Sequence, residues 1–390
     1  MKKILHLIYV TLAVQNCIWA NSIDSSEGVR DPHDQISRIS ECNVQGILQP
    51  KIASAGINGG FTLGASFLYQ QSSVDLLTAA RTVNITGMPA DGLIAKEQID
   101  TMDYKWQPGM RVSAGYIFSQ RDQLKLNITW THLRGKGSSE VLFNDPTFKN
   151  GSLKPVWFPF LLGPLADQAT STWDCKLNLL DGTFGRSFFL GKWLVMQPYG
   201  GVRGAWINQD YLAKYHAAWM IDTTGTGNLT LSFKDTRFDA QNKFKGVGLL
   251  FGLETDWYVT RNFCAFTNFK TSLLYAKFDI TQTSEGQIII PISTIPTIIV
   301  PETISMTRGF HRIRPSLEGE IGIKWEKFFC GNSYRLFMGV SYEFSFWFCQ
   351  PLFENVTNYL DGVQNSFATS FVDPRNLQFQ GINIQAGFDF

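Results

Sequence analysis

The dominant pattern along this chain is an alternation of apolar and polar residues with a period of two. In Tyr334–Trp347, Leu336, Met338 and Val340 fall in one phase, whereas the other phase holds small or polar residues such as Glu343. Successive side chains of a β-strand point to opposite faces, so this segment is predicted to be a strand with one apolar and one wetter face.

The last residues of the chain repeat this pattern. Ile384, Ala386 and Phe388 share one phase, and Asn383 and Gln385 share the other. A water-soluble sheet seldom ends on an exposed aromatic strand, because its unpaired edge would invite aggregation. A barrel that closes this strand against the first one, with the apolar side in lipid, leaves no open edge.

Ten segments alternate in this way, and short and long connections alternate between them. The segments are 61–70, 104–118, 124–133, 173–188, 193–208, 245–258, 263–280, 312–327, Tyr334–Trp347 and 382–390. Short periplasmic turns and long external loops are typical of outer-membrane barrels. The fold class predicted is therefore all-β, a transmembrane antiparallel up-and-down β-barrel. The long segments have room for further crossings, with 211–220 and 229–233 as candidates, so we expect about 12–16 strands.

Composition favours the same fold over a soluble β-sandwich. Charged residues are 17% and aromatic residues 14% of the 390-residue chain, which would leave a soluble surface too apolar for water. The mean hydropathy is -0.06, and after the N-terminal segment there is no apolar run of about 18 residues, so helical spans are not expected. The net charge of +1 gives no support for nucleic-acid binding.

The N-terminal residues 1–20 have the features of a secretory signal peptide. Lys2 and Lys3 precede an apolar stretch, and Ala20 stands before a polar segment. We expect a signal peptide at 1–20, a polar periplasmic segment at 21–56 and an outer-membrane barrel at 57–390. The predicted location is the bacterial outer membrane, with its lipid as the surrounding partner.

The polar phase of the strands nominates pore-lining residues, because side chains facing the lumen set the radius and charge that a solute meets. They are Arg111, Lys125, Asn127, Glu254, Lys270, Glu318, Glu320, Lys324, Arg335 and Glu343. Both signs occur, so strong ion selectivity is not expected. The alternative is that these charges form internal salt bridges and fill the lumen. Arg203 shares a phase with Ala205 and Ile207, which leaves its facing open.

Aromatic residues at strand ends predict interfacial girdles. They are Tyr116, Trp130, Trp206, Trp257, Trp325 and Phe390, and packing against loops is the alternative for some of them. The terminal aromatic strand, with Phe388 and Phe390, is similar to the signal that barrel-assembly machinery recognises. Two apolar loop segments, 156–165 and 288–300, contain or follow prolines, which disfavour a helix or a central strand. They are expected to fold inward as a constriction, to present an apolar external surface or to pack on the barrel rim.

Five cysteines remain after the signal segment, and an odd number leaves at least one unpaired within the chain. Cys42, Cys264 and Cys330 fall near the predicted periplasmic turns, and Cys175 and Cys349 lie toward the external ends. They are candidates for disulfide cross-links in an oxidising compartment, and inert thiols are the alternative.

No motif predicts an enzyme, a cofactor or a metal. The stretch 185–192 is one residue too long for a phosphate loop, and Trp193 replaces the needed Ser or Thr. The histidines are scattered without metal-ligand spacing.

The ordered set of motifs resembles the major outer-membrane protein family of Legionella and the porin-like proteins of environmental chlamydiae. The stretches that carry the resemblance are 67–69, 106–116, 128–131, 184–189, 197–207, 272–275, 311–315 and 380–390. Gln70 departs from the Trp expected there. The resemblance implies an outer-membrane porin that assembles as an oligomer, a trimer by analogy, and has a role in envelope integrity and host contact. It supplies no catalytic residues, and the chlamydial likeness fits disulfide-linked envelope partners.

Two functions follow as hypotheses. The first is a porin that allows passive diffusion of small hydrophilic solutes. The second is a structural or adhesive envelope protein in which the barrel serves as an anchor and surface loops contact partners or a host.

Overall fold

The computed structural model describes most of the chain from Gly60 onward. The described residues are 60–75, 77, 80–85, 95–99, 101–118, 124–142, 151–157, 166–190, 193–216, 218–219, 232–260, 262–290, 298–329, 334–350, 354–361, 364–371 and 375–390. Two units separate along the chain, Met1–Ile47 and Leu48–Phe390, and every described residue belongs to the second. The expected signal peptide and periplasmic segment therefore lie outside the described residues.

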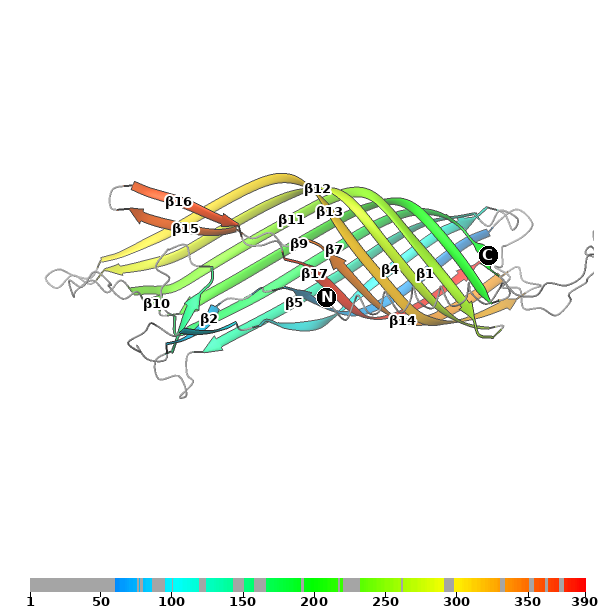
Figure 1. The fold of residues 1–390 in the computed structure, drawn as a ribbon, viewed down its shortest axis with the longest axis horizontal. Helices are drawn as coiled ribbons and strands as arrows, with labels where there is room; N and C mark the ends of the chain where they lie inside the picture. Colours follow the sequence, from blue (N-terminus) through cyan, green and yellow to red (C-terminus); the bar gives the residue numbers. More distant parts are fainter. Residues whose placement is uncertain are drawn as a thin grey trace, which may run out of the picture. The chain divides into compact units, whose positions relative to one another are not determined.

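Ten long antiparallel strands form one closed wall (Figure 1). In wall order they are β1 (Gly60–Val74), β4 (Asp103–Ile117), β5 (Leu124–Leu142), β7 (Gln168–Arg186), β9 (Leu194–His216), β11 (Ser232–Tyr258), β12 (Phe263–Ile290), β13 (Ile298–Phe329), β14 (Tyr334–Trp347) and β17 (Leu377–Asp389). The last strand pairs with the first from Thr62↔Asp389 to Val74↔Leu377, which closes the barrel. The predicted fold class is confirmed.

The wall has ten strands, so the expectation of 12–16 crossings is corrected. Of the candidates for further crossings, 211–216 continues β9, and Ser232 and Phe233 begin β11. The short strands β8 (Phe188–Leu190) and β10 (Ala218–Trp219) extend hairpins of the wall. Long connections also form two small sheets: β15 (Glu354–Asp361) with β16 (Gln364–Phe371), and β3 (Ala95–Ile99) with β2 (Ala80–Ile85) and β6 (Gly151–Pro155).

The register of the pairs shows that the strands are strongly staggered. One row of paired residues runs Trp325, Met338, Ala386, Ala65, Val112, Trp130, Leu180, Gly204, Val247, Tyr275 and Ile313. It leaves β13 at Trp325 and returns to β13 at Ile313, 12 positions away. Such a stagger requires strands tilted about 35–45° from the barrel axis.

The outer face of the wall is apolar over its lower part, toward the short turns. On β12, the outward residues run from Phe263 (52% exposed) through Leu273 to Tyr275 (59% exposed). Thirteen residues span about 40 Å along a strand, or about 30 Å along the membrane normal at a 40° tilt, enough for the hydrocarbon core. Some of the aromatic residues expected at the interfaces lie on this face: Trp130, Trp206 and Trp257 are 39–44% exposed.

The strands on one side continue well beyond this apolar band. On β12, the outward residues after Tyr275 are Lys277, Asp279 and Thr281, whereas Phe278 and Ile280 are fully buried on the inner face. The side chains therefore still alternate with a period of two, but here the polar residues face outward and the apolar residues face the interior. Within the described residues, no helix is long and apolar enough to span a membrane.

An apolar cluster fills the interior near the long-loop end. Trp157, which follows β6, stacks on Phe238 at 5.3 Å between ring centroids and lies 5.6 Å from the ring of Tyr211. Its backbone N–H donates to the hydroxyl of Tyr215 at 3.3 Å. Val156 and Trp157 thus fold inward, as one of the expectations for the 156–165 loop requires; residues 158–165 lie outside the described part.

The second proline-bounded loop segment is partly strand, which corrects the expectation for 288–300. Residues 288–290 end β12, and 298–300 begin β13. β13 pairs with β12 up to Ile298, but β14 reaches only to the pair Ser316↔Trp347. Pro301 therefore lies where β13 is an edge strand, and an edge tolerates a residue that lacks an N–H donor.

Candidate functional site

The centre of the lumen holds an ion-paired group built on Arg203. The guanidinium forms a bidentate pair with Asp181 on the neighbouring strand β7, with Nε–Oδ1 and Nη2–Oδ2 distances of 2.7 Å. Its Nη1 donates to Glu318 of β13. β11 and β12 separate β9 from β13 along the wall, so the pair with Glu318 crosses the lumen. Arg203 is fully buried, which settles its facing as inward.

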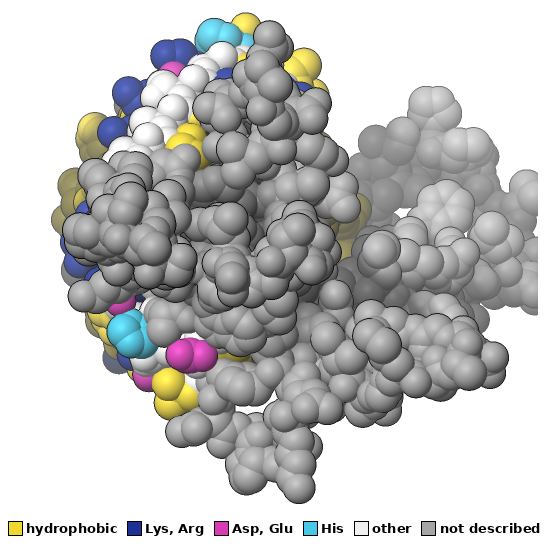
Figure 2. Space-filling view, turned by 90° about the vertical axis from the view of Figure 1, so that its left-hand side faces the viewer, with side chains coloured by type: hydrophobic (Ala, Val, Ile, Leu, Met, Phe, Trp, Pro, Cys, Tyr) yellow, Lys and Arg dark blue, Asp and Glu magenta, His cyan; other side chains and the backbone are white. Residues whose placement is uncertain are grey.

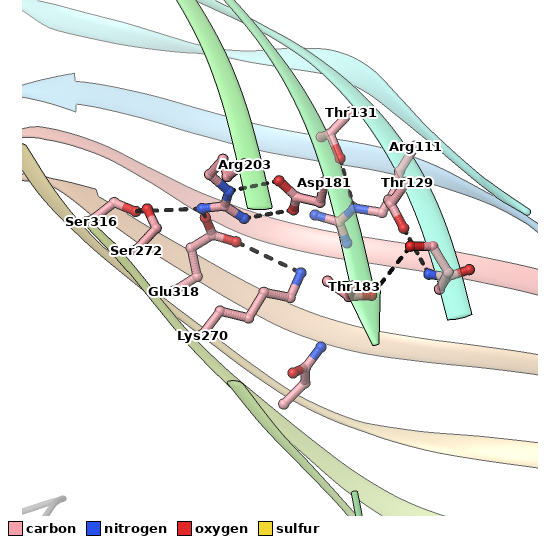
Figure 3. Close-up of polar contacts among 12 residues, drawn as sticks. Arg111, Thr129, Thr131, Asp181, Thr183, Arg203, Lys270, Ser272, Ser316 and Glu318 are labelled. Atoms are coloured by element: carbon pink, nitrogen blue, oxygen red, sulfur yellow. Dashed lines mark hydrogen bonds and ion pairs between the residues drawn. The ribbon is translucent and has the colours of Figure 1, made fainter. Parts of the chain in front are cut away.

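The neighbours of this triad complete its hydrogen bonding (Figure 3). Lys270 Nζ lies 3.7 Å from the second oxygen of Glu318. Arg203 Nη1 also lies 3.4 Å from Ser316 Oγ, and the hydroxyls of Ser316 and Ser272 are 2.6 Å apart. A buried charge is tolerated only when its partners satisfy it, and here two cations face two carboxylates.

A second ion pair spans the lumen beside the first. Arg111 of β4 donates to Glu343 of β14 at 2.6 Å, and its Nε donates to Thr131 at 3.1 Å. β1 and β17 lie between these two strands in the wall. Glu320 accepts hydrogen bonds from Ser341 at 2.6 Å and Asn383 at 2.9 Å.

A third charged group lies nearer the short-turn end. Lys324 Nζ contacts Asp256 at 3.1 Å and Glu326 at 3.5 Å. Arg335 contacts Glu326 at 3.5 Å and donates from Nε to Asp389 at 2.6 Å. Charges of both signs thus neutralise one another across strands β11, β13, β14 and β17.

All ten residues nominated as pore-lining lie on strand positions that face the lumen. Seven of them make ion pairs there: Arg111, Glu254, Lys270, Glu318, Lys324, Arg335 and Glu343. Glu320 accepts hydrogen bonds, as described, and Asn127 donates to Thr129 at 2.9 Å. Lys125 lies in the inward phase of β5. Whether these residues line a conducting pore stays a prediction, and the interior they form is extensively salt-bridged.

Sequence reasoning missed several members of these groups. Asp181 follows two leucines, and Asp256 precedes Trp257, so neither drew attention as a polar position. Glu326 and Asp389 lie in the polar phase of their strands but were not nominated. The sequence did contain a usable signal. An acid within a membrane-crossing strand, such as Asp181, needs a buried cation as its partner, and Arg203 was a strand cation to which no partner had been assigned.

The described cysteines lie toward the ends of the barrel that were expected, with Cys175 in the long-loop half of β7. Cys264 lies at the short-turn end of β12, and Cys349 follows β14 at the opposite end with a positive φ of 58°. Cys175 lies inside β7 and is fully buried, as Cys264 nearly is. Cys175, Cys264 and Cys349 are free thiols, whereas Cys42 and Cys330 lie outside the described residues.

The short-turn end carries the terminal aromatic residues. The ring of Phe390 lies 6.0 Å from Phe61 and 5.9 Å from Phe388, and Phe61 in turn packs on Tyr116 at 4.9 Å. Within the described ranges, no three His, Cys, Asp or Glu side chains are grouped so that they could hold a metal ion.

Solved structures similar to this chain are outer-membrane proteins of low sequence identity. The protease OmpT of Escherichia coli has 8% identity and a TM-score of 0.37, with 88% of this chain and 99% of that chain covered. The toluene transporter TodX of P. putida has 9% identity and a TM-score of 0.27, covering 86% and 90%. OprG of Pseudomonas aeruginosa has 11% identity and a TM-score of 0.22, covering 66% and 99%. Likenesses this weak carry no argument about activity.

The family comparison is specific. A comparison with curated protein sequences finds no match. The family model described as "Legionella pneumophila major outer membrane protein precursor" matches residues 56–390, which include the whole barrel. The chain therefore belongs to the Legionella major outer membrane protein family and is an integral outer-membrane β-barrel protein.

Proposed function

We propose that this protein is a narrow, gated outer-membrane channel for passive diffusion of small hydrophilic solutes. The observation that carries the proposal is the polar lumen: in the central and short-turn parts of the wall the outer face is apolar, and the inner face holds most of the charged side chains. This inner face carries at least six cation–carboxylate pairs, and a charged lining of this kind suits hydrophilic solutes. Membership in an outer-membrane protein family supports this location for the channel.

The channel is narrow and has two barriers. Barrels of eight strands have interiors just filled by side chains, whereas those of 16–18 strands leave an aqueous channel, and ten strands stand near the lower limit. The pairs Arg203–Glu318 and Arg111–Glu343 cross the lumen at mid-height. The apolar cluster around Trp157 forms a second barrier toward the long loops. Both signs of charge line the path, so weak ion selectivity is expected.

Planar-bilayer conductance tests this proposal. The wild-type protein is expected to give small, infrequent steps, and Trp157→Ala is expected to raise open probability severalfold, because the indole packs between Tyr211 and Phe238 at the mouth. Trp193→Ala is the matched control, since Trp193 is 51% exposed at the short-turn end. If both the wild-type protein and Trp157→Ala are correctly folded and neither gives conductance steps, the channel proposal is refuted.

A structural or adhesive role is the second candidate. The observation that favours it is the long wall of β9, β11, β12 and β13, which continues past the apolar band with a polar exterior (Figure 1). In this role the barrel is an anchor, and Cys349, the described cysteine that is partly exposed, is a candidate for cross-links to envelope partners. Silence in the bilayer, together with a disulfide-linked species in non-reducing electrophoresis that Cys349→Ser abolishes, would favour this role.

A further inference from the structure

A basic surface borders the apolar band on one side of the wall. The last apolar row there runs through Trp130, Leu180, Gly204, Val247, Tyr275 and Ile313. The next two outward rows, toward the long loops, contain five exposed cations and one acid. The cations, called here the basic sector, are Arg134, Lys176, Lys243, Lys245 and Lys277, and the acid is Asp279.

The basic sector places like charges opposite each other on neighbouring strands. Arg134 lies directly opposite Lys176 on the neighbouring strand, and Lys245 lies directly opposite Lys277. Like charges directly opposite each other destabilise a sheet. Lys277 Nζ has a partner in Asp279 at 2.9 Å, but no ion pair within the described residues joins Lys176, Lys243 or Lys245 to an acid. Of the four cations in the two opposed pairs, only Lys277 has an ion-pair partner among the described residues.

The basic sector is confined to one side of the wall. At the corresponding border of β1 and β17, the outward residues are Gln71, Ser73, Gln378 and Gln380, which are uncharged. The cations are thus not a general feature of the polar border. Figure 2, viewed from the long-loop end, shows dark-blue Lys and Arg side chains recurring along the left-hand rim beside yellow apolar ones.

We propose that the basic sector binds the phosphates of an anionic glycolipid in the outer leaflet of the membrane. Such a lipid has acyl chains that lie against the apolar band and phosphates at the level where the chains end. The basic sector directly follows that band, so one molecule can make both contacts. Lysine ammonium groups bind phosphate as compact point charges, and each cation near a charged membrane surface contributes measurably to binding. The acids Asp174 and Asp210 lie in the next row out, beyond the phosphates.

Lipid binding to the detergent-solubilised full chain tests this proposal. The probes are diphosphorylated lipid A and its dephosphorylated form, with binding measured by native mass spectrometry and by fluorescence titration. The test variant is Lys176→Gln/Lys243→Gln/Lys245→Gln. The control is Lys105→Gln/Lys214→Gln/Lys327→Gln, which removes the same charge from exposed lysines outside the basic sector.

The test variant is expected to bind the phosphorylated lipid about a hundredfold more weakly than wild type. The control variant should bind like wild type, and removal of the phosphates from the lipid should weaken binding to wild type to a similar extent. Equal binding by wild type and test variant would overturn the proposal. Unchanged lipid binding combined with lost binding of heparin, a soluble polyanion, would also overturn it and assign the surface to a soluble partner. Heat-modified gel mobility verifies that each variant is folded.

Discussion

Replacing Arg203 with methionine is expected to destabilise the barrel by about 3–5 kcal/mol, because it leaves the buried Asp181 without a cation and Glu318 with Lys270 alone. Asp181 and Glu318 are both about 95% buried, and the bidentate pair with Asp181 is lost completely. Urea-induced unfolding in phospholipid vesicles, followed by tryptophan fluorescence and heat-modified gel mobility, measures the change in unfolding free energy.

A charge-matched rescue separates this effect from loss of packing. Arg203→Met combined with Asp181→Asn removes one uncompensated carboxylate and should recover part of the lost stability. Arg237→Met is the control, because Arg237 forms an exposed pair with Asp239 at 3.0 Å, and such pairs contribute at most about 1 kcal/mol. If Arg203→Met costs no more than Arg237→Met, the lumen is water-filled at this level and the triad is not a buried barrier.

Replacing Ile321 with arginine is expected to cost about 2–4 kcal/mol, because its side chain faces the membrane interior. Ile321 is 60% exposed on the outer face of β13, between Thr267 and Tyr342 of the neighbouring strands. Thr307→Arg, on the same strand and the same face but beyond the apolar band, should be nearly neutral. The same unfolding assay compares the two. Similar costs at both positions would show that lipid does not contact Ile321.

The ten crossings were predictable because each membrane-spanning strand must present apolar side chains to lipid and is free to present polar ones inward. That requirement produces an alternation of apolar and polar residues with a period of two in segments such as Tyr334–Trp347, whose predicted and observed bounds are identical. The N-terminal parts of β11 and β13 and the C-terminal ends of β9 and β12 were not predicted. The parts outside the predicted segments are 209–216 of β9, 232–244 of β11, 281–290 of β12 and 298–311 of β13. They lie beyond the lipid, where the inner face is filled by residues such as Tyr211, Phe238 and Phe244.

The reversed polarity also explains the overestimate of the strand count. The segments 211–220 and 229–233 were candidates for further crossings. Their described parts lie elsewhere: residues 211–216 continue β9, and Ser232 and Phe233 begin β11. These two strands pair with each other from Trp257↔Leu194 to Thr236↔Tyr215. The alternating pattern alone identifies a strand. Whether that strand is a further crossing or the continuation of a neighbouring one is decided by the strand with which it pairs.

The candidate site was predictable in facing but not in pairing. Parity placed Glu318, Glu343 and Arg111 inside, because strand geometry fixes which side each residue faces. Their partners lie three strands away across the lumen, and nothing local in the sequence encodes that distance. Arg203 was ambiguous because its inward neighbours Ala205 and Ile207 belong to the apolar filling, so the usual rule of polar inside and apolar outside failed there.

Spin-label accessibility along β14 tests the central claim that lipid surrounds a closed wall with a polar lumen. Single cysteines at Val340 and Tyr342, which are 49% and 44% exposed, and at Ser341 and Ser345, which are 4% and 7% exposed, are placed in a variant without native cysteines and reconstituted in vesicles. Labels at 340 and 342 should collide strongly with oxygen, which concentrates in lipid, and labels at 341 and 345 should collide weakly. Equal accessibility of all four labels, or a stronger oxygen effect at 341 and 345, would contradict the barrel orientation on which the channel and the lipid-binding surface both depend.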